Sequence, residues 1–185
     1  MKLATVRHHL GDCTRCPLHE SRTRLVFGCG NESAAVVLVG EAPGAREDAA
    51  GTPFVGAAGK LLDRMLDRIG LSRQDIYIAN VLKCRPPENR NPRPEEIETC
   101  VPFLLRQIGA IRPRVVGTLG NFSTRVLLGT REGITALRGR TFVRKGFRIV
   151  PMYHPAAALH NGALRSEIER DFDRLEALLA RSQIR

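Results

Sequence analysis

The chain has 185 residues, enough for one domain with its own hydrophobic core. Its 29 Lys and Arg against 19 Asp and Glu give a formal charge of +10 at pH 7. The first residues lack the apolar run of a signal peptide, and no later run is long enough to cross a membrane. We therefore expect a cytoplasmic protein without a membrane partner.

The basic charge is concentrated in one tract. Between Arg106 and Arg148 the sequence has ten Arg or Lys and one acid, Glu132, whereas the last 23 residues balance five Arg with five acids. The planar guanidinium of Arg suits phosphate oxygens. A polyanion is therefore the partner that this tract favours, and a merely solvated basic surface is the alternative.

Four of the five cysteines form two pairs. A short helix is predicted over the first ten residues, and a C-x-x-C turn follows it. The paired cysteines are Cys13 with Cys16 and Cys84 with Cys100. Disulfides are rare in a reducing compartment, so four thiolates predict either a zinc site or an iron–sulfur cluster. Cys29, in a turn expected over 28–33, is expected to be inert.

Strands and helices alternate in the first half of the chain. Unbroken apolar runs predict buried strands at 34–39 and 76–82, and an apolar stripe predicts a helix over 61–69. Residues 40–56 lie between them, with four Gly, two Pro, three acids and an exposed-looking Phe54. A loop of this length is usually functional, so we expect it to form the floor of a substrate pocket.

The second half continues this alternation. Its expected elements are a Pro-rich loop over 84–94, a helix over 94–108, a strand near 114–119, a helix after Gly120, a loop over 129–139, a strand pair at 141–143 and 147–152, and a final helix with an apolar face from Leu164 to Leu179. The pattern predicts an α/β fold. We expect a single three-layer domain over 1–185, with a central, mostly parallel four-stranded sheet flanked by helices.

Polar residues stand at the ends of three predicted strands. Glu41 follows the first strand, Asn80 closes the second, and His154 follows the last. The carboxyl ends of parallel strands share one edge, where ligands bind. Each residue alone has a structural alternative as a turn cap, a backbone partner or a loop histidine. Together they predict a site at that edge.

At these positions the sequence closely resembles the family 4 uracil-DNA glycosylases, iron–sulfur enzymes of the uracil-DNA glycosylase superfamily. The matching motifs, between Cys13 and about Asn161, are Gly40-Glu-Ala-Pro-Gly44, Glu47-Asp48, Gly51-Thr-Pro-Phe-Val-Gly56, Asn80-Val-Leu-Lys83-Cys84-Arg-Pro-Pro and His154-Pro-Ala. The resemblance implies that Cys13, Cys16, Cys84 and Cys100 bind a 4Fe-4S cluster rather than zinc. The implied activity is base-excision repair: hydrolysis of the N-glycosidic bond of uracil in DNA, which releases uracil and leaves an abasic site.

The resemblance also assigns the residues that bind uracil. Phe54 is the platform on which the flipped base stacks, and Gly40 and Glu47 belong to the same pocket. Asn80 reads the edge of the base, because an amide can donate to uracil O4 and accept from N3–H. Cytosine presents the opposite pattern and should be rejected.

The catalytic roles follow from the negative charge that develops on the base as the bond is cleaved. Cleavage leaves an anionic base, so a donor aimed at uracil O2 gives the largest gain. His154 resembles the donor of the family and can act while neutral. Glu41 and Asn89 are the candidates for holding the water that attacks C1′.

The contacts to DNA are expected at three places. Leu159, in a loop over 154–159, is the wedge that enters the gap left by the flipped base, while Arg85, Arg90 and the basic tract contact phosphates. Family members often have Arg where this chain has His160, so one phosphate contact is in doubt. We expect a monomer on single- or double-stranded DNA that contains uracil, and the sequence leaves a sliding clamp open as a partner.

Other functions fit less well. A sister branch binds covalently through a His in an inserted loop, but no His occurs between His19 and His154. Lys83 shows no sign of a desolvated pocket, so a Schiff-base lyase is not expected. Gly40-Glu-Ala-Pro-Gly44 is not a nucleotide-binding glycine loop. A DNA sensor that binds a metal and does no chemistry is the main alternative.

Overall fold

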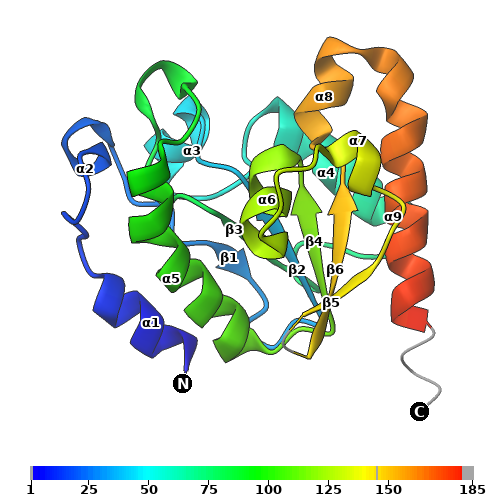
Figure 1. Cartoon of the computed structure of the whole chain (residues 1–185), viewed down its shortest axis with the longest axis horizontal. Coiled ribbons are helices and arrows are strands. Elements are labelled where there is room, and N and C mark those ends of the chain that lie inside the picture. Colours follow the sequence, from blue (N-terminus) through cyan, green and yellow to red (C-terminus); the bar gives the residue numbers. More distant parts are fainter. Residues whose placement is uncertain (1, 145, 181–185) are drawn as a thin grey trace.

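A six-stranded sheet forms the centre of the computed structural model, which describes residues 2–144 and 146–180 (Figure 1). The strands stand in the order β1-β3-β2-β4-β6-β5. Their bounds are β1 Cys29–Gly30, β2 Val36–Gly40, β3 Tyr77–Asn80, β4 Val115–Leu119, β5 Phe142–Arg144 and β6 Phe147–Met152.

The sheet is parallel at its centre and antiparallel at both edges. Strands β3, β2, β4 and β6 pair in parallel, whereas β1 and β5 pair antiparallel with β3 and β6. The four central strands and the predicted strand at 141–143, now β5, are confirmed, but a four-stranded sheet is wrong because β1 and β5 pair at its edges. We expected a turn where β1 lies. At Gly30 a Cβ would be 2.1 Å from the carbonyl oxygen of Ile76, so the close pairing requires glycine.

Helices cover both faces of the sheet (Figure 1). One face packs against α1 Leu3–Leu10, α5 Pro94–Ile111 and α6 Asn121–Leu128. The other packs against α4 Ala57–Arg68 and α9 Arg165–Ala180. Neighbouring strand residues point to opposite faces, so Val37 and Val39 join the first layer, while Val36 and Leu38 join the second. The three-layer α/β architecture is confirmed.

Short helices account for most differences from the expected elements. The segments expected as loops contain α3 Ala45–Ala50, η1 Pro87–Asn89, α7 Ile134–Leu137 and α8 Pro155–His160; α2 Leu18–Ser21 and η2 Gly162–Leu164 are also short. Helices of four to six residues are not stable alone, and distant groups hold them. Asn121 Oδ1, for example, accepts from the Ile134 backbone N–H at 2.7 Å, at the start of α7.

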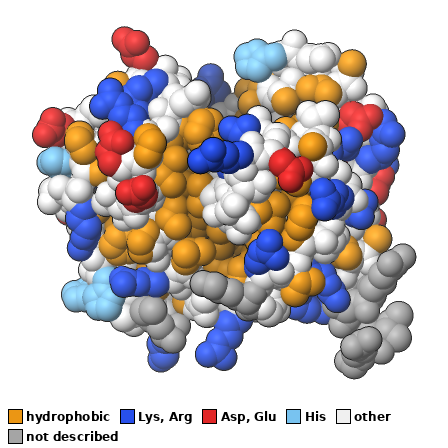
Figure 2. Space-filling view, viewed as in Figure 1, with side chains coloured by type: hydrophobic (Ala, Val, Ile, Leu, Met, Phe, Trp, Pro, Cys, Tyr) orange, Lys and Arg blue, Asp and Glu red, His pale blue; other side chains and the backbone are white. Residues whose placement is uncertain are grey.

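Apolar side chains gather between α5 and α6 on the face seen in Figure 2. The molecule also has a hollow of about 410 Å³ whose lining residues include Leu105, Ile108, Arg112, Pro113 and Phe147.

No helix within the described ranges is long and apolar enough to cross a bilayer.

Candidate active site and cysteine site

A cavity of about 510 Å³ opens at the carboxyl ends of β2, β3 and β6, a size that suits a small ligand. The predicted residues that line it are Glu41, Glu47, Phe54, Asn80, Asn89 and His154. The structure therefore brings together side chains that lie up to 113 positions apart in the sequence, from 41 to 154. The lining residues that the sequence did not single out include Ala58 and Ala156, because small alanines carry no sequence signal. His160, which the sequence analysis considered only for a phosphate contact, also lines the cavity.

Gly40 allows the walls of the cavity to meet. Its carbonyl accepts from the Val81 N–H at 3.0 Å, which extends the pairing of β2 with β3. A Cβ on Gly40 would be 2.4 Å from Asn80 Oδ1 and 2.9 Å from the ring of Phe54. Any larger residue would push these two side chains apart.

Asn80 holds an unsatisfied acceptor at the bottom of the cavity. Its side chain is 2% exposed, and Oδ1 has no hydrogen-bond partner among the described residues. A buried acceptor without a donor costs about 1–3 kcal/mol. A ligand that presents an N–H group to Oδ1 would remove this cost.

Phe54 is buried rather than exposed, which corrects the expectation from its loop. Its ring stacks on the imidazole of His154, with 5.4 Å between the centroids and 28° between the planes. The backbone of Phe54 has a φ of 55°, a left-handed value that costs energy in a residue with a Cβ. Arg73 holds this conformation, because its guanidinium donates to the carbonyl oxygens of Pro53, at 3.2 Å, and of Phe54.

For the uracil release that the resemblance implies, Arg73→Ala is expected to lower kcat/KM about tenfold, or ~1.4 kcal/mol, because the strained Phe54 backbone loses its two donors. Kinetics on a uracil-containing oligonucleotide would measure the change. Arg68→Ala is the matched control, since Arg68 pairs with Asp173 on the exposed surface of α4 and α9. Equal rates for the two variants would contradict the role of Arg73.

His154 is held as a neutral side chain with a defined tautomer. It is the N-cap of α8, and its Nδ1 accepts from the Ala156 N–H at 3.1 Å. Because Nδ1 accepts, the proton of the neutral ring is on Nε2. Burial lowers the pKa of His154 to about 4, although the negative charge of Glu47 acts against this. Nε2–H is therefore available as a hydrogen-bond donor over the physiological pH range.

Acid should destabilise the protein through His154. Its pKa is about 4 in the folded protein and ~6.5 when unfolded, so between these values only the unfolded chain binds the proton. Stability is therefore lost as the pH falls from ~6.5 toward 4. We expect His154→Ala to lose less thermal stability than the parent between pH 7.5 and 4.5. His8→Ala, on the exposed surface of α1, should follow the parent. Parallel curves for all three would contradict the buried, neutral state of His154.

Two polar residues at the cavity have defined partners, and a third is desolvated. Glu47 Oε1 accepts from the N–H groups of Val55 and Gly56, at 2.9 and 2.8 Å, so this acid braces the loop that carries Phe54. Asn89 Oδ1 accepts from Arg85 Nε at 2.8 Å. Burial raises the pKa of Glu41, which makes its carboxylate a stronger proton acceptor.

The predicted DNA contacts have different surroundings. Leu159 is 48% exposed on the short helix α8, beside the cavity, although a loop was expected there. Arg85 is half-buried and holds Asn89. Arg90 makes two hydrogen bonds to Glu96, whose side chain is buried, and so braces the Pro-rich loop against the start of α5.

The structure separates the basic tract into two parts. Four of its arginines lie at the amino ends of the parallel strands, away from the cavity at the carboxyl ends: Arg112, Arg114, Arg144 and Arg148. These arginines and the cavity therefore lie at opposite edges of the sheet, because a strand carries the chain from one edge to the other. That the tract contacts DNA phosphates stays a prediction.

The four paired cysteines line a second, apolar cavity. Cys13, Cys16, Cys84 and Cys100 meet there with apolar side chains such as Leu10 and Phe103. Arginines donate to two of the sulfurs: Arg15 Nη1 lies 3.2 Å from Cys13 Sγ, and Arg22 Nη1 lies 3.3 Å from Cys84 Sγ. Cys29 lies apart in β1, and burial raises the pKa of its thiol.

The chemistry of the cavity lining bears on what it could hold. Within the described part of the chain, no three His, Cys, Asp or Glu side chains form a site for a single metal ion. Cysteine thiolates are the ligands of iron–sulfur clusters, and the arginines beside two of the sulfurs would offset thiolate charge. The donor set therefore suits such a cluster.

Lys83 is desolvated, which corrects the expectation. Its side chain is 1% exposed, and Nζ donates to the Asn80 carbonyl oxygen at 2.8 Å. Burial lowers its pKa to about 8. However, Lys83 lines the cysteine cavity and does not line the larger cavity with His154. It is therefore not placed to attack a sugar bound there.

Comparisons with known proteins agree with this geometry. The family model described as the uracil DNA glycosylase superfamily matches residues 27–177. The chain is 47% identical to the type-4 uracil-DNA glycosylase of Archaeoglobus fulgidus, over 92% of this chain and 90% of the relative. It is 42% identical to that of Thermotoga maritima, over 94% and 93%, and 34% identical to a type-5 enzyme of Pyrobaculum aerophilum, over 80% of each. The chain therefore belongs to the uracil-DNA glycosylase superfamily and is a member of its type-4 branch.

Proposed function

We propose that the protein is a monofunctional uracil-DNA glycosylase of base-excision repair. It hydrolyses the N-glycosidic bond of uracil in DNA, releases free uracil and leaves an abasic site. The observation that carries this proposal is the buried, unsatisfied Asn80 Oδ1 in a cavity that Phe54 and His154 also line. Uracil N3–H is the donor that this oxygen lacks.

Base recognition follows from the shape of the cavity. The target nucleotide leaves the stack so that its base can enter. The base packs against Phe54, and the Asn80 amide accepts from N3–H and donates to O4. Gly40 and Glu47 contribute indirectly, because Gly40 gives room to both side chains and Glu47 holds the loop after Phe54. Cytosine would place a hydrogen-bond acceptor opposite Asn80 Oδ1. Two acceptors cannot form a hydrogen bond, so cytosine is rejected.

Bond cleavage depends on stabilising the departing base. As the C1′–N1 bond breaks, negative charge develops on uracil O2, and the neutral His154 donates from Nε2 to that oxygen. The Nδ1 bond to Ala156 N–H fixes this tautomer before substrate binds. Glu41 and Asn89, at the same cavity, hold the water, and the Glu41 carboxylate accepts its proton as the water attacks C1′.

A 4Fe-4S cluster would be held by Cys13, Cys16, Cys84 and Cys100. When bound, the cluster supplies a rigid link between residues 13–16, the Pro-rich loop and α5, with no redox step. Leu159, Arg85 and Arg90 face DNA in this proposal, with Leu159 filling the gap left by the base. The whole chain acts as one domain and one monomer in the cytoplasm, and a sliding clamp stays open as a partner.

A base-release assay tests the proposal. Protein purified without air should be yellow-brown, and it should release uracil, but not thymine, from an oligonucleotide while leaving the strand intact at the abasic site. An oligonucleotide with hypoxanthine would define the range of bases. Tight DNA binding with no base released would refute the enzyme and support a sensor instead. A colourless protein that contains zinc would refute the cluster.

A further inference from the structure

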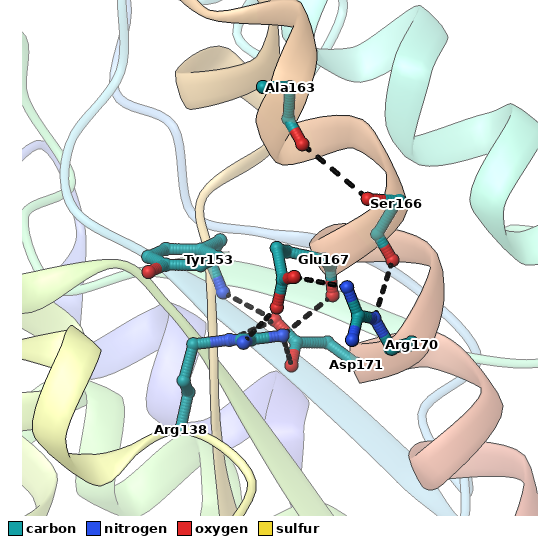
Figure 3. Close-up of polar contacts among 7 residues, drawn as sticks. All are labelled: Arg138, Tyr153, Ala163, Ser166, Glu167, Arg170 and Asp171. Atoms are coloured by element: carbon teal, nitrogen blue, oxygen red, sulfur yellow. Dashed lines mark hydrogen bonds and ion pairs between the residues drawn. The ribbon is translucent and has the colours of Figure 1, made fainter.

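A buried acid on α9 reaches the backbone immediately before His154. Figure 3 shows side chains from α9 and Arg138 converging on Tyr153. The last pair of the β4–β6 ladder joins Leu119 to Met152, so the N–H of Tyr153 lies just beyond the strand pairing. Asp171 Oδ2 accepts from this N–H at 2.9 Å. The carboxylate therefore replaces the acceptor that the sheet no longer offers.

Asp171 is held in turn by a fork of donors. Its side chain is 3% exposed, and Arg138 donates to it from Nη2 at 2.8 Å and from Nε at 3.4 Å. The same guanidinium donates to the Glu167 carbonyl oxygen at 2.8 Å and to its carboxylate, and lies 4.6 Å from the ring centroid of Tyr153. Figure 3 shows these contacts together. Such a buried charge is stable only when its partners satisfy it.

These contacts complete a frame around His154. Asp171 fixes the N–H of the preceding residue, Tyr153, the N-cap bond to Ala156 fixes the turn after His154, and Phe54 packs on its ring. Each contact constrains a different part of the residue. We propose that Asp171, oriented by Arg138, is a positioning residue that aims His154 Nε2 at the leaving oxygen. This inference rests on the proposed function.

A carboxylate is required here because three donors converge on it. They are the Tyr153 N–H and the two nitrogens of Arg138, Nε and Nη2. An amide has one acceptor oxygen and brings an NH₂ group that would face donors. Asp171→Asn therefore keeps the size of the side chain but leaves at least one donor unmet, which releases the backbone of Tyr153 or turns Arg138 away.

The test compares Asp171→Asn with Glu167→Gln in the full chain. Single-turnover uracil release should fall about 10- to 100-fold in Asp171→Asn, because misplacing a supporting group commonly costs this much. Its Kd for DNA with a non-hydrolysable uracil analogue should stay within about threefold. Glu167→Gln is the matched control, because it weakens the same network. It leaves the bond from the Tyr153 N–H to Asp171 and the bond from Arg138 to the carbonyl oxygen of residue 167. It should slow release by less than about threefold.

A spectroscopic readout separates positioning from a general loss of stability. The imidazole ¹⁵N shifts of His154 should report the Nε2–H tautomer in the parent and in Glu167→Gln, and a mixture of tautomers in Asp171→Asn. If the parent releases no uracil, the proposed function fails, and the tautomers still test Asp171. Parent-like tautomer and rate in Asp171→Asn, or equal losses in both variants, would overturn the inference. If Asp171→Asn does not fold, Arg138→Lys provides the test instead. A parent-like His154 tautomer in Arg138→Lys would also overturn the inference.

Discussion

His154→Ala should lower the single-turnover rate of uracil release about 100- to 1,000-fold, or ~3–4 kcal/mol, while DNA binding changes little. The reason is that Nε2–H meets charge that exists on the leaving oxygen only as the bond breaks, so its loss raises the barrier rather than the Kd. Rates measured at saturating enzyme, beside Kd values for a non-hydrolysable analogue, would check both parts.

Two further variants define what His154 contributes. His154→Gln keeps an N–H donor near the same place and should recover part of the lost rate. His8→Ala, on the exposed surface of α1, should match the parent. A loss confined to DNA binding, with the chemical rate unchanged, would show that His154 is not the donor to the leaving group.

Asn80→Ala should separate activity from stability. Uracil release is expected to fall about 100-fold or more, ~3 kcal/mol, because two hydrogen bonds to the base are lost. The free energy of unfolding should not fall in the same way, because the substitution removes a buried acceptor that has no partner among the described residues. Kinetics and denaturant unfolding of the same preparation would measure both quantities.

A satisfied asparagine provides the control. Asn31 is exposed and does not line the cavity, and its Oδ1 accepts from the Ser33 N–H at 2.8 Å. Asn31→Ala should lose about 0.5–1.5 kcal/mol of stability and keep its activity. If Asn80→Ala kept the parental rate, or if both variants lost stability alike, Asn80 would be a structural residue rather than the reader of the base.

Longer elements and their order could be predicted from the sequence. The central strands carry unbroken apolar runs and the helices α4, α5 and α9 carry periodic apolar patterns, and local sequence records both directly. Three of the shorter elements could not be predicted: β1 has two residues, and α7 and α8 have four and six. Segments of this length have no usable period, and distant contacts such as that of Asn121 with Ile134 decide their conformation.

For the site, the sequence determined which side chains meet, because Glu41, Asn80 and His154 stand at the ends of parallel strands that share one edge. Tertiary structure alone decided how they meet. It buried Phe54 against His154, fixed the imidazole tautomer and placed part of the basic tract at the opposite edge. It also brought Asp171 to Tyr153 from 18 positions away. Such contacts depend on how helices pack on the sheet, and packing geometry is not encoded in any local pattern of residues.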